Sequence, residues 1–284
     1  MPDAKRILIV DDDPDVHDLL RKALKQTGRY LESAFSGDEG LKKFEAAHWD
    51  LVITDVIMPG MGGMELLERV RKIRPETPVV VMTVDSTAEK IVSALRDNAF
   101  SWFRKPFATQ AVRDMVDSAL APTRLKDDIE VLSASPRWLE LRLRCDMETA
   151  TRALHFVREM EQGLTDSDRD NVALAFREIL FNAVEHGGGN DPSVYVTITY
   201  MRADGALLFR VRDPGPGFSF AKLRHAALSN PPDEPAAHAA NRDALGMRPG
   251  GFGILLTREF VDELIYNEKG NEALLIKYLP RVQK

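Results

Sequence analysis

Residues 7–16, ILIVDDDPDV, place a short aliphatic run directly before three aspartates and a proline. A run of this kind is typical of a parallel strand that is buried on both faces. Further aliphatic runs at 51–53, 79–82 and 100–103, and a weaker one at 30–34, alternate with segments whose apolar residues have helical spacing. Because strands alternate with helices, this part of the chain is predicted to form βαβ units around a parallel sheet that helices cover on both faces.

Polar side chains follow these strands at the points where they end. Asp11 and Asp12 follow the first run, Asp55 follows the run at 51–53, and Thr83 and Lys105 follow the two later runs. The carboxyl ends of parallel strands meet at one edge of a sheet, where ligands collect. Carboxylates that converge there repel one another unless a hard cation such as Mg²⁺ binds them. These residues therefore predict a Mg²⁺-dependent site in which Asp55 acts as a nucleophile and becomes an acyl phosphate.

The stretches ILIVDDDPDV, DLVITDVIMPGMGG, VVVMT and WFRKPF occur in an order and spacing that resemble the response regulator receiver family over residues 1–122. The resemblance implies a five-stranded, doubly wound α/β fold of the flavodoxin-like type. It also implies that a sensor histidine kinase phosphorylates Asp55. The further site residues that it implies are the Mg²⁺ ligands Asp11, Asp12 and Asp55 with the main-chain carbonyl of Ile57, and the phosphate-binding side chains Thr83 and Lys105.

The pattern changes after the first 122 residues. Residues 121–136 are polar, charged and bounded by prolines, which predicts a linker over 123–137 with a helical turn around 127–132. From residue 138 onward the order of elements predicts a second, α+β domain over 138–284 with an antiparallel sheet. Its expected strands are 139–144, 194–201, 206–212, 263–267 and 272–279, and its expected helices are 149–162, 168–185 and 253–262.

Three motifs in this second part carry chemistry. In residues 177–186, REILFNAVEH, Glu178 and Asn182 lie one helical turn apart and share a face. An Asn there can bind Mg²⁺ through its amide oxygen, and a Glu can act as a general base. In residues 213–218, DPGPGF, the carboxylate of Asp213 can accept a hydrogen bond from an adenine amino group. Residues 250–254, GGFGI, open a helix, and a glycine-rich helix N-terminus is suited to binding phosphate.

Together these motifs resemble the Bergerat-fold (GHKL) ATPases, and within them the serine-protein-kinase anti-sigma factors, over residues 138–284. The stretches REILFNAVEHG and GGFGILLTREFVDELIYNEKGNEALLIKYL carry the closer resemblance. The resemblance implies that ATP and Mg²⁺ bind here and that residues 220–249 form a lid over the phosphates. The implied residues are Asn182 for Mg²⁺, Glu178 as the base, Asp213 for adenine, and Gly215, Gly217, Gly251 and Gly253 for the shape of the nucleotide pocket.

The composition sets outer limits on the function. The chain has 284 residues, a formal net charge of -6, 44% hydrophobic residues and one cysteine, Cys145. A negative net charge argues against a protein whose whole surface binds nucleic acid, and no apolar run approaches the ~20 residues that span a bilayer. A single cysteine allows no intrachain disulfide, which fits a reducing compartment. We therefore expect a cytoplasmic protein without direct binding to nucleic acid or membrane.

The sequence favours a response regulator whose phosphorylation at Asp55 controls an ATP-dependent serine/threonine kinase of the anti-sigma-factor type. In that family the partner is a small anti-sigma antagonist of the STAS type, and a sigma factor competes with it. A different function is also open, in which the second domain binds ATP and sequesters a partner without transferring phosphate. A third alternative is a phosphate sink with an inert second domain. The cognate sensor, the substrate, the sign of regulation and homodimerisation stay open.

Overall fold

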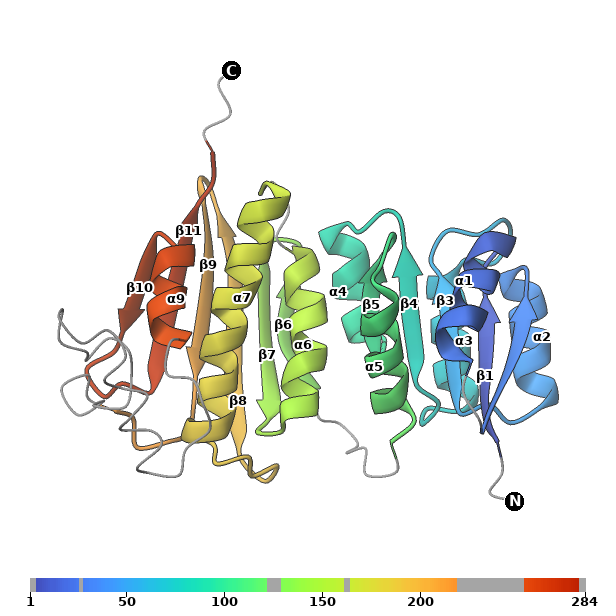
Figure 1. Ribbon diagram of the computed structural model, residues 1–284, viewed down its shortest axis with the longest axis horizontal. Helices are drawn as coiled ribbons and strands as arrows, with labels where there is room; N and C mark the ends of the chain where they lie inside the picture. Colours follow the sequence, from blue (N-terminus) through green and yellow to red (C-terminus); the bar gives the residue numbers. More distant parts are fainter. Residues whose placement is uncertain (1–3, 26–27, 122–128, 161–163, 219–252, 281–284) are drawn as a thin grey trace. The chain divides into compact units, whose positions relative to one another are not determined.

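The computed structural model describes residues 4–25, 28–121, 129–160, 164–218 and 253–280 (Figure 1). The chain divides into two compact units, Met1–Lys126 and Asp127–Lys284. In the described part of the chain, no helix is both long enough and apolar enough to cross a membrane. Each unit is built around its own sheet.

The first unit alternates strands and helices, as the aliphatic runs predict. Its described strands form a five-stranded parallel sheet in the order β2-β1-β3-β4-β5. This confirms the doubly wound, flavodoxin-like fold class. The elements are β1 (Lys5–Val10), α1 (Pro14–Leu24), β2 (Arg29–Ala34), α2 (Gly37–Ala46), β3 (Leu51–Asp55), α3 (Gly63–Ile73), β4 (Val79–Thr83), α4 (Ala88–Arg96), β5 (Ser101–Arg104) and α5 (Thr109–Ala119).

Strand β1 is buried on both faces, as its continuous aliphatic run requires. Ile7 and Ile9 join the core cluster that includes residues of α1 and α5. Val10 faces the opposite layer, where a Cβ added to Gly40 of α2 would lie 2.8 Å from its Cγ1 atom. The strand stops at Asp11, and Asp13 then caps α1 by accepting a hydrogen bond from the Asp15 amide, with Pro14 at the helix start. Asp11 is thereby left at the carboxyl edge of the sheet.

The second unit is an α+β domain with an antiparallel sheet, as expected. Its described strands form a six-stranded sheet in the order β10-β11-β9-β8-β7-β6. Figure 1 shows α6, α7 and α9 on one face of this sheet. The elements are β6 (Ile129–Ser135), β7 (Trp138–Arg144), α6 (Met147–Met160), α7 (Asp166–Asn182), a π-helix (Ala183–Gly187), β8 (Tyr195–Ala203), β9 (Ala206–Arg212), α9 (Gly253–Phe260), β10 (Glu263–Tyr266) and β11 (Glu272–Tyr278).

Alternation along the strands separates the core of this unit from its outer face. Phe209 of β9 is fully buried and packs against Phe176 of α7, with 5.4 Å between the ring centroids. Tyr200 of β8 is also buried, and its hydroxyl donates to the Met160 carbonyl at 2.8 Å. On the outer face, Arg210 of β9 pairs with Glu272 of β11. The core of the described part therefore lies between the sheet and helices α6, α7 and α9.

Three expectations from the sequence are wrong in detail. The expected linker over 123–137 contains strand β6, Ile129–Ser135, which pairs with β7 through a bulge, so the helical turn around 127–132 is also wrong there. This edge strand does not stand out in the sequence, because its alternation of apolar and polar residues is interrupted at Leu132, where the pairing with β7 shifts register. In addition, α7 ends at Asn182, and the residues beyond it wind into a π-helix. The expected lid over 220–249 lies outside the described residues.

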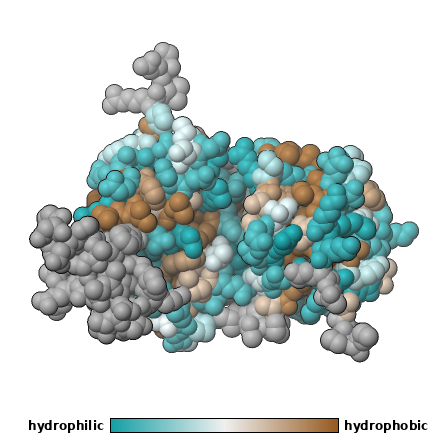
Figure 2. All heavy atoms as spheres, in the orientation of Figure 1, coloured by the Kyte–Doolittle hydropathy of each residue, from teal (hydrophilic) through white to brown (hydrophobic). Residues whose placement is uncertain are grey.

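Hydrophobic residues gather on the surface over α9 and the adjoining part of α7 (Figure 2). Leu174 of α7 and Leu256 of α9 are each 44% exposed. These two helices carry the first and the third of the chemical motifs. The second unit thus presents an apolar surface beside its candidate nucleotide site.

The assignment of the core face can be tested with two neighbouring residues of β9. Phe209→Ala should lower the free energy of unfolding of the second unit by about 3–5 kcal/mol, because it leaves a cavity against Phe176. Leu208→Ala is the control, since Leu208 points to the opposite face and is only half-buried. Scanning calorimetry of the full chain measures both variants. A larger loss for Leu208→Ala than for Phe209→Ala would contradict the assignment.

Candidate functional site

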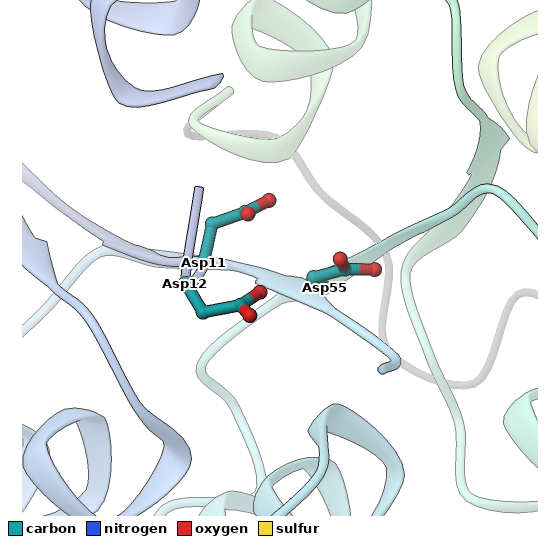
Figure 3. Close-up of side chains that lie close together, drawn as sticks. All are labelled: Asp11, Asp12 and Asp55. Atoms are coloured by element: carbon teal, nitrogen blue, oxygen red, sulfur yellow. The ribbon is translucent and has the colours of Figure 1, made fainter. Parts of the chain in front are cut away.

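Three aspartates meet at the carboxyl edge of the first sheet. Asp11 and Asp12 follow β1, and Asp55 ends β3, which pairs with β1. Each offers a carboxylate oxygen, and these oxygens all lie within 4.8 Å of one another (Figure 3). Asp11 is fully buried, Asp55 is 6% exposed and Asp12 is exposed. The structure thus brings together the three carboxylates that the sequence places in one site.

Lys105 lies between two of these carboxylates. Its Nζ atom donates to Asp11 Oδ2 at 2.7 Å and to Asp55 Oδ2 at 2.9 Å. Burial by itself would lower the pKa of Lys105, but its hydrogen bonds to the two carboxylates outweigh burial and raise the pKa above its ordinary value. Burial raises the pKa of Asp11, and the hydrogen bonds from Lys105 and from the Asp13 amide reverse only part of that effect. Lys105 therefore holds two buried negative charges next to each other.

Two further residues lie close to this cluster: Ile57 is two residues beyond Asp55 in the chain, and Thr83 ends the neighbouring strand β4. Thr83 is fully buried at the end of β4, one residue beyond Met82, which pairs with Asp55. Its hydroxyl exchanges hydrogen bonds with the main chain of Asp85, at 3.1 and 3.3 Å. The Ile57 amide donates to Asp55 Oδ1 at 3.5 Å, and the Ile57 side chain is 49% exposed.

The donor set of this site suits Mg²⁺. Carboxylate oxygens are the ligands that hard divalent cations prefer, and Mg²⁺ needs only one or two of them because it keeps several waters. The exposed Asp12 leaves one side of the cluster open to solvent, and a cation there would neutralise charge that Lys105 alone does not balance. The residues present therefore fit a Mg²⁺ ion bound by Asp11, Asp12 and Asp55.

His17 of α1 supports the site in a way that the sequence did not indicate. It is buried, and its Nε2 atom lies 2.8 Å from the Asp11 carbonyl oxygen. A carbonyl only accepts, so Nε2 carries the proton and donates. The Nδ1 atom lies 2.8 Å from the hydroxyl of Ser33 in β2. His17 thus fixes the main chain of Asp11 from behind, and a histidine on the buried face of a helix was the only signal available.

In the second unit, the first and third motifs meet. Glu178 and Asn182 lie one turn apart on α7, and both are half-buried. A Cβ atom added to Gly253, the first residue of α9, would lie 2.6 Å from Glu178 Oε2. The Glu178 carboxylate therefore lies against the N-terminus of α9, where main-chain N–H groups attract anions. Gly251 lies outside the described residues.

The second motif meets the residue directly after the first motif, beyond the C-terminal end of α7. A Cβ atom added to Gly187 in the π-helix would lie 2.3 Å from Asp213 Cγ. The Asp213 side chain accepts a hydrogen bond from the Gly215 amide at 2.8 Å through Oδ1. Burial raises the pKa of Asp213, and that hydrogen bond lowers it only in part. Gly217, with φ of 78°, allows the loop to approach Lys269, since a Cβ atom there would lie 1.9 Å from the Lys269 carbonyl oxygen.

These residues fit a Mg²⁺-bound adenine nucleotide. The Asp213 carboxylate can accept from an adenine amino group, and the Asn182 amide oxygen can ligate a cation. The glycines at 187, 215 and 253 approach the carboxylates of Asp213 or Glu178 too closely to carry a side chain, so main chain lies against these carboxylates. The π-helix directly after Asn182 is a further pointer that the sequence did not reveal, because such wide turns are frequent at functional sites.

The role of Lys105 predicts a pH-dependent loss of stability. Lys105→Met should destabilise the first unit by about 3 kcal/mol at pH 8, because it leaves Asp11 and Asp55 buried without a counter-charge. In the variant, the folded state binds protons more tightly than the unfolded chain, so the loss should shrink as the pH falls toward 5. Denaturant unfolding without divalent cations measures both values. Lys72→Met, at an exposed position of α3, is the control, and an equal loss at both pH values would contradict the prediction.

Comparisons with known proteins assign each unit to a family. Residues 7–117 match the response regulator receiver domain, and residues 143–277 match the histidine kinase-like ATPase domain. The chain is 33% identical over 198 residues to the transcriptional regulatory protein GlrR of Escherichia coli (strain K12), which is 68% of this chain and 41% of GlrR. It is 36% identical over 137 residues to the regulatory protein AtoC of the same strain, which is 47% of this chain and 30% of AtoC. The chain spans less than half the length of these curated relatives.

Among solved structures, a CheY-like receiver domain protein from Methanospirillum hungatei JF-1 is 34% identical, with a TM-score of 0.40. The match covers 41% of this chain and 93% of that one. The two family matches show that the chain joins a response regulator receiver domain, over residues 7–117, to a histidine kinase-like ATPase domain, over residues 143–277.

Proposed function

We propose that this protein is a two-component response regulator whose phosphorylation at Asp55 controls a serine/threonine protein kinase of the anti-sigma-factor type. The observation that supports kinase activity is the position of Glu178. Its carboxylate lies against the N-terminus of α9, one helical turn from Asn182, and Asp213 lies beside Gly187 in the π-helix that follows α7. This arrangement suits a transfer of phosphate from ATP. Glu178 lies at a helix N-terminus that can bind phosphate, and Asp213 can accept a hydrogen bond from the adenine amino group.

In the receiver domain, Asp55 takes the phosphoryl group from a sensor histidine kinase. A carboxylate oxygen of Asp55 forms a bond to phosphorus as the bond from phosphorus to the donor's histidine nitrogen breaks, and the nitrogen leaves with the electron pair. Mg²⁺, when bound by Asp11, Asp12, Asp55 and the Ile57 carbonyl, neutralises charge on the phosphoryl oxygens. Lys105 then exchanges its contact with Asp55 for one with a phosphoryl oxygen, and the Thr83 hydroxyl donates to another.

In the ATPase domain, Asp213 recognises adenine and Glu178 serves as the general base. Glu178 takes the proton of a serine or threonine hydroxyl while that oxygen bonds to the γ-phosphorus, and ADP leaves with the electrons of the broken bond. Asn182 contributes a ligand for Mg²⁺, and Gly215, Gly217, Gly251 and Gly253 shape the pocket. The sequence predicts a receiver over 1–122 and a kinase over 138–284, and we propose to extend the kinase to residue 129 because strand β6 (Ile129–Ser135) pairs with β7.

The substrate that we propose is a small anti-sigma antagonist of the STAS type. In this scheme a sigma factor and the unphosphorylated antagonist compete for the same kinase, so the phosphorylation state of Asp55 regulates transcription through protein binding. The exposed apolar surface of α7 and α9, with Leu174 and Leu256, lies beside the nucleotide site and suits such a partner.

A second candidate function is ATP-dependent sequestration of a partner without phosphoryl transfer. The same apolar surface favours it, because a surface beside the nucleotide can bind a partner whether or not Glu178 removes a proton. The two functions differ in whether a phosphorylated product forms.

Asp55→Asn should abolish labelling of the protein by a small phosphodonor such as acetyl phosphate, because an amide cannot form the acyl phosphate. The fold should persist, since Asn has nearly the same shape. Mass spectrometry of the intact protein measures the added phosphoryl group. Asp18→Asn, on the surface of α1, is the control and should label as the wild type does. Full labelling of Asp55→Asn would contradict the assignment.

Glu178→Gln should separate chemistry from binding. The substitution keeps the shape and helix propensity but removes proton acceptance, and a lost general base typically lowers the rate about 10²–10⁴-fold. Affinity for ATP should stay within a few-fold. Transfer of labelled γ-phosphate to a STAS-type antagonist measures the rate, and calorimetry measures the affinity. Glu259→Gln, exposed on α9, is the control.

Two outcomes decide between the candidates. Transfer by Glu178→Gln at the wild-type rate would refute the base role. A wild type that binds ATP and the antagonist but forms no phosphorylated product would favour sequestration.

A further inference from the structure

The turn between β10 and β11, residues 267–271, forms hydrogen bonds with the main chain of Asp213, which is distant in the sequence. Asn271 Nδ2 donates to the Asp213 carbonyl at 3.1 Å, and the Asp213 amide donates to the Asn271 carbonyl at 3.0 Å. Asn271 is 7% exposed. A carbonyl only accepts, so the amide nitrogen of Asn271 must face Asp213, and this orientation follows from chemistry. Both main-chain hydrogen-bonding groups of Asp213 are thus held by one residue.

The same turn is rigid. Asn267 Oδ1 accepts hydrogen bonds from the Gly270 amide at 2.8 Å and from the Asn271 amide at 3.1 Å. Asn267 Nδ2 donates to Asn271 Oδ1 at 3.0 Å, so the Asn271 side chain is fixed at both ends. A buried amide with its donor and its acceptor both engaged has one orientation only.

The loop that follows Asp213 packs on this turn through main chain. A Cβ atom added to Gly270 would lie 2.1 Å from the Phe218 carbonyl oxygen, and Gly217 approaches Lys269 as closely. The Phe218 ring also packs edge-on against Tyr266 of β10, with 5.1 Å between the centroids. The 267–271 turn therefore supports the whole DPGPGF loop, from Asp213 to Phe218.

We infer that Asn271 is a positioning residue that sets the base specificity of the nucleotide site. Adenine presents an amino donor where guanine presents a carbonyl acceptor, so a fixed carboxylate favours adenine and repels guanine. The Gly215 amide donates to Asp213 Oδ1, which leaves Oδ2 to accept from adenine. The direction of Oδ2 depends on the main chain of Asp213, which Asn271 holds. This inference rests on the proposed ATP binding at Asp213, and it adds the residue on which discrimination between ATP and GTP depends.

The test uses the full chain and compares ATP with GTP. Asn271→Asp keeps the shape but cannot donate to the Asp213 carbonyl, and the affinity for ATP should fall about fivefold to tenfold. The affinity for GTP should not change, so the ratio of the affinity for ATP to the affinity for GTP should fall by the same factor. Asn271→Ser retains a short donor and should give an intermediate ratio. Glu268→Gln, at an exposed position of the same turn, should match the wild type.

Each outcome is decisive because specificity and stability are measured separately. Calorimetry gives the two affinities, and a melting curve reports whether the variants are folded. If Asn271→Asp and Asn271→Ser lower the melting temperature but leave the ATP to GTP ratio unchanged, Asn271 is merely structural and the inference is wrong. If the wild type prefers ATP and both variants keep that preference, the inference fails while the proposed function stands. If the wild type binds neither nucleotide, the proposed function fails first.

Discussion

Both candidate sites depend on one constraint, which is that the main chain behind a functional aspartate must not move. A carboxylate at the end of a strand selects its ligand by direction as well as by charge. In the first unit, His17 donates to the Asp11 carbonyl from the buried face of α1. In the second unit, Asn271 donates to the Asp213 carbonyl from the turn after β10. Each contact comes from a buried polar side chain whose own remaining groups are also engaged, so the aspartate is held by a network.

Charge organises the receiver site around that main chain. Asp11 and Asp55 are buried beside each other, and Lys105 is the ammonium that makes this arrangement stable. A divalent cation and a phosphoryl group would change this balance in opposite directions, because one adds positive charge and the other negative. The balance of charge at the ends of β1, β3 and β5 is therefore sensitive to both.

Close approach of main chain organises the candidate nucleotide site. Glycines at 187, 253 and 217 bring the end of α7, the start of α9 and the DPGPGF loop into contact with carboxylates or with one another. A Cβ atom at any of these positions would meet another atom at less than 3 Å. The three motifs, far apart in the sequence, thus come close together because none of these contacts requires room for a side chain at the glycine.

The sequence by itself determined the two fold classes, because uninterrupted aliphatic runs and period-two alternation report directly on how strands are buried. It also determined that Asp11, Asp12 and Asp55 would converge, since parallel strands end at a common edge. Tertiary structure alone decided the rest. Strand β6 lacks a regular alternation of apolar and polar residues, and it forms as a strand by pairing with the edge that β7 offers. The residues of the π-helix after Asn182 carry no feature that distinguishes it from the end of a regular helix. The contacts of His17 with Ser33 and of Asn271 with Asp213 join residues that are far apart in the sequence. No local pattern encodes such contacts, because their hydrogen bonds form only when packing has brought the two segments together.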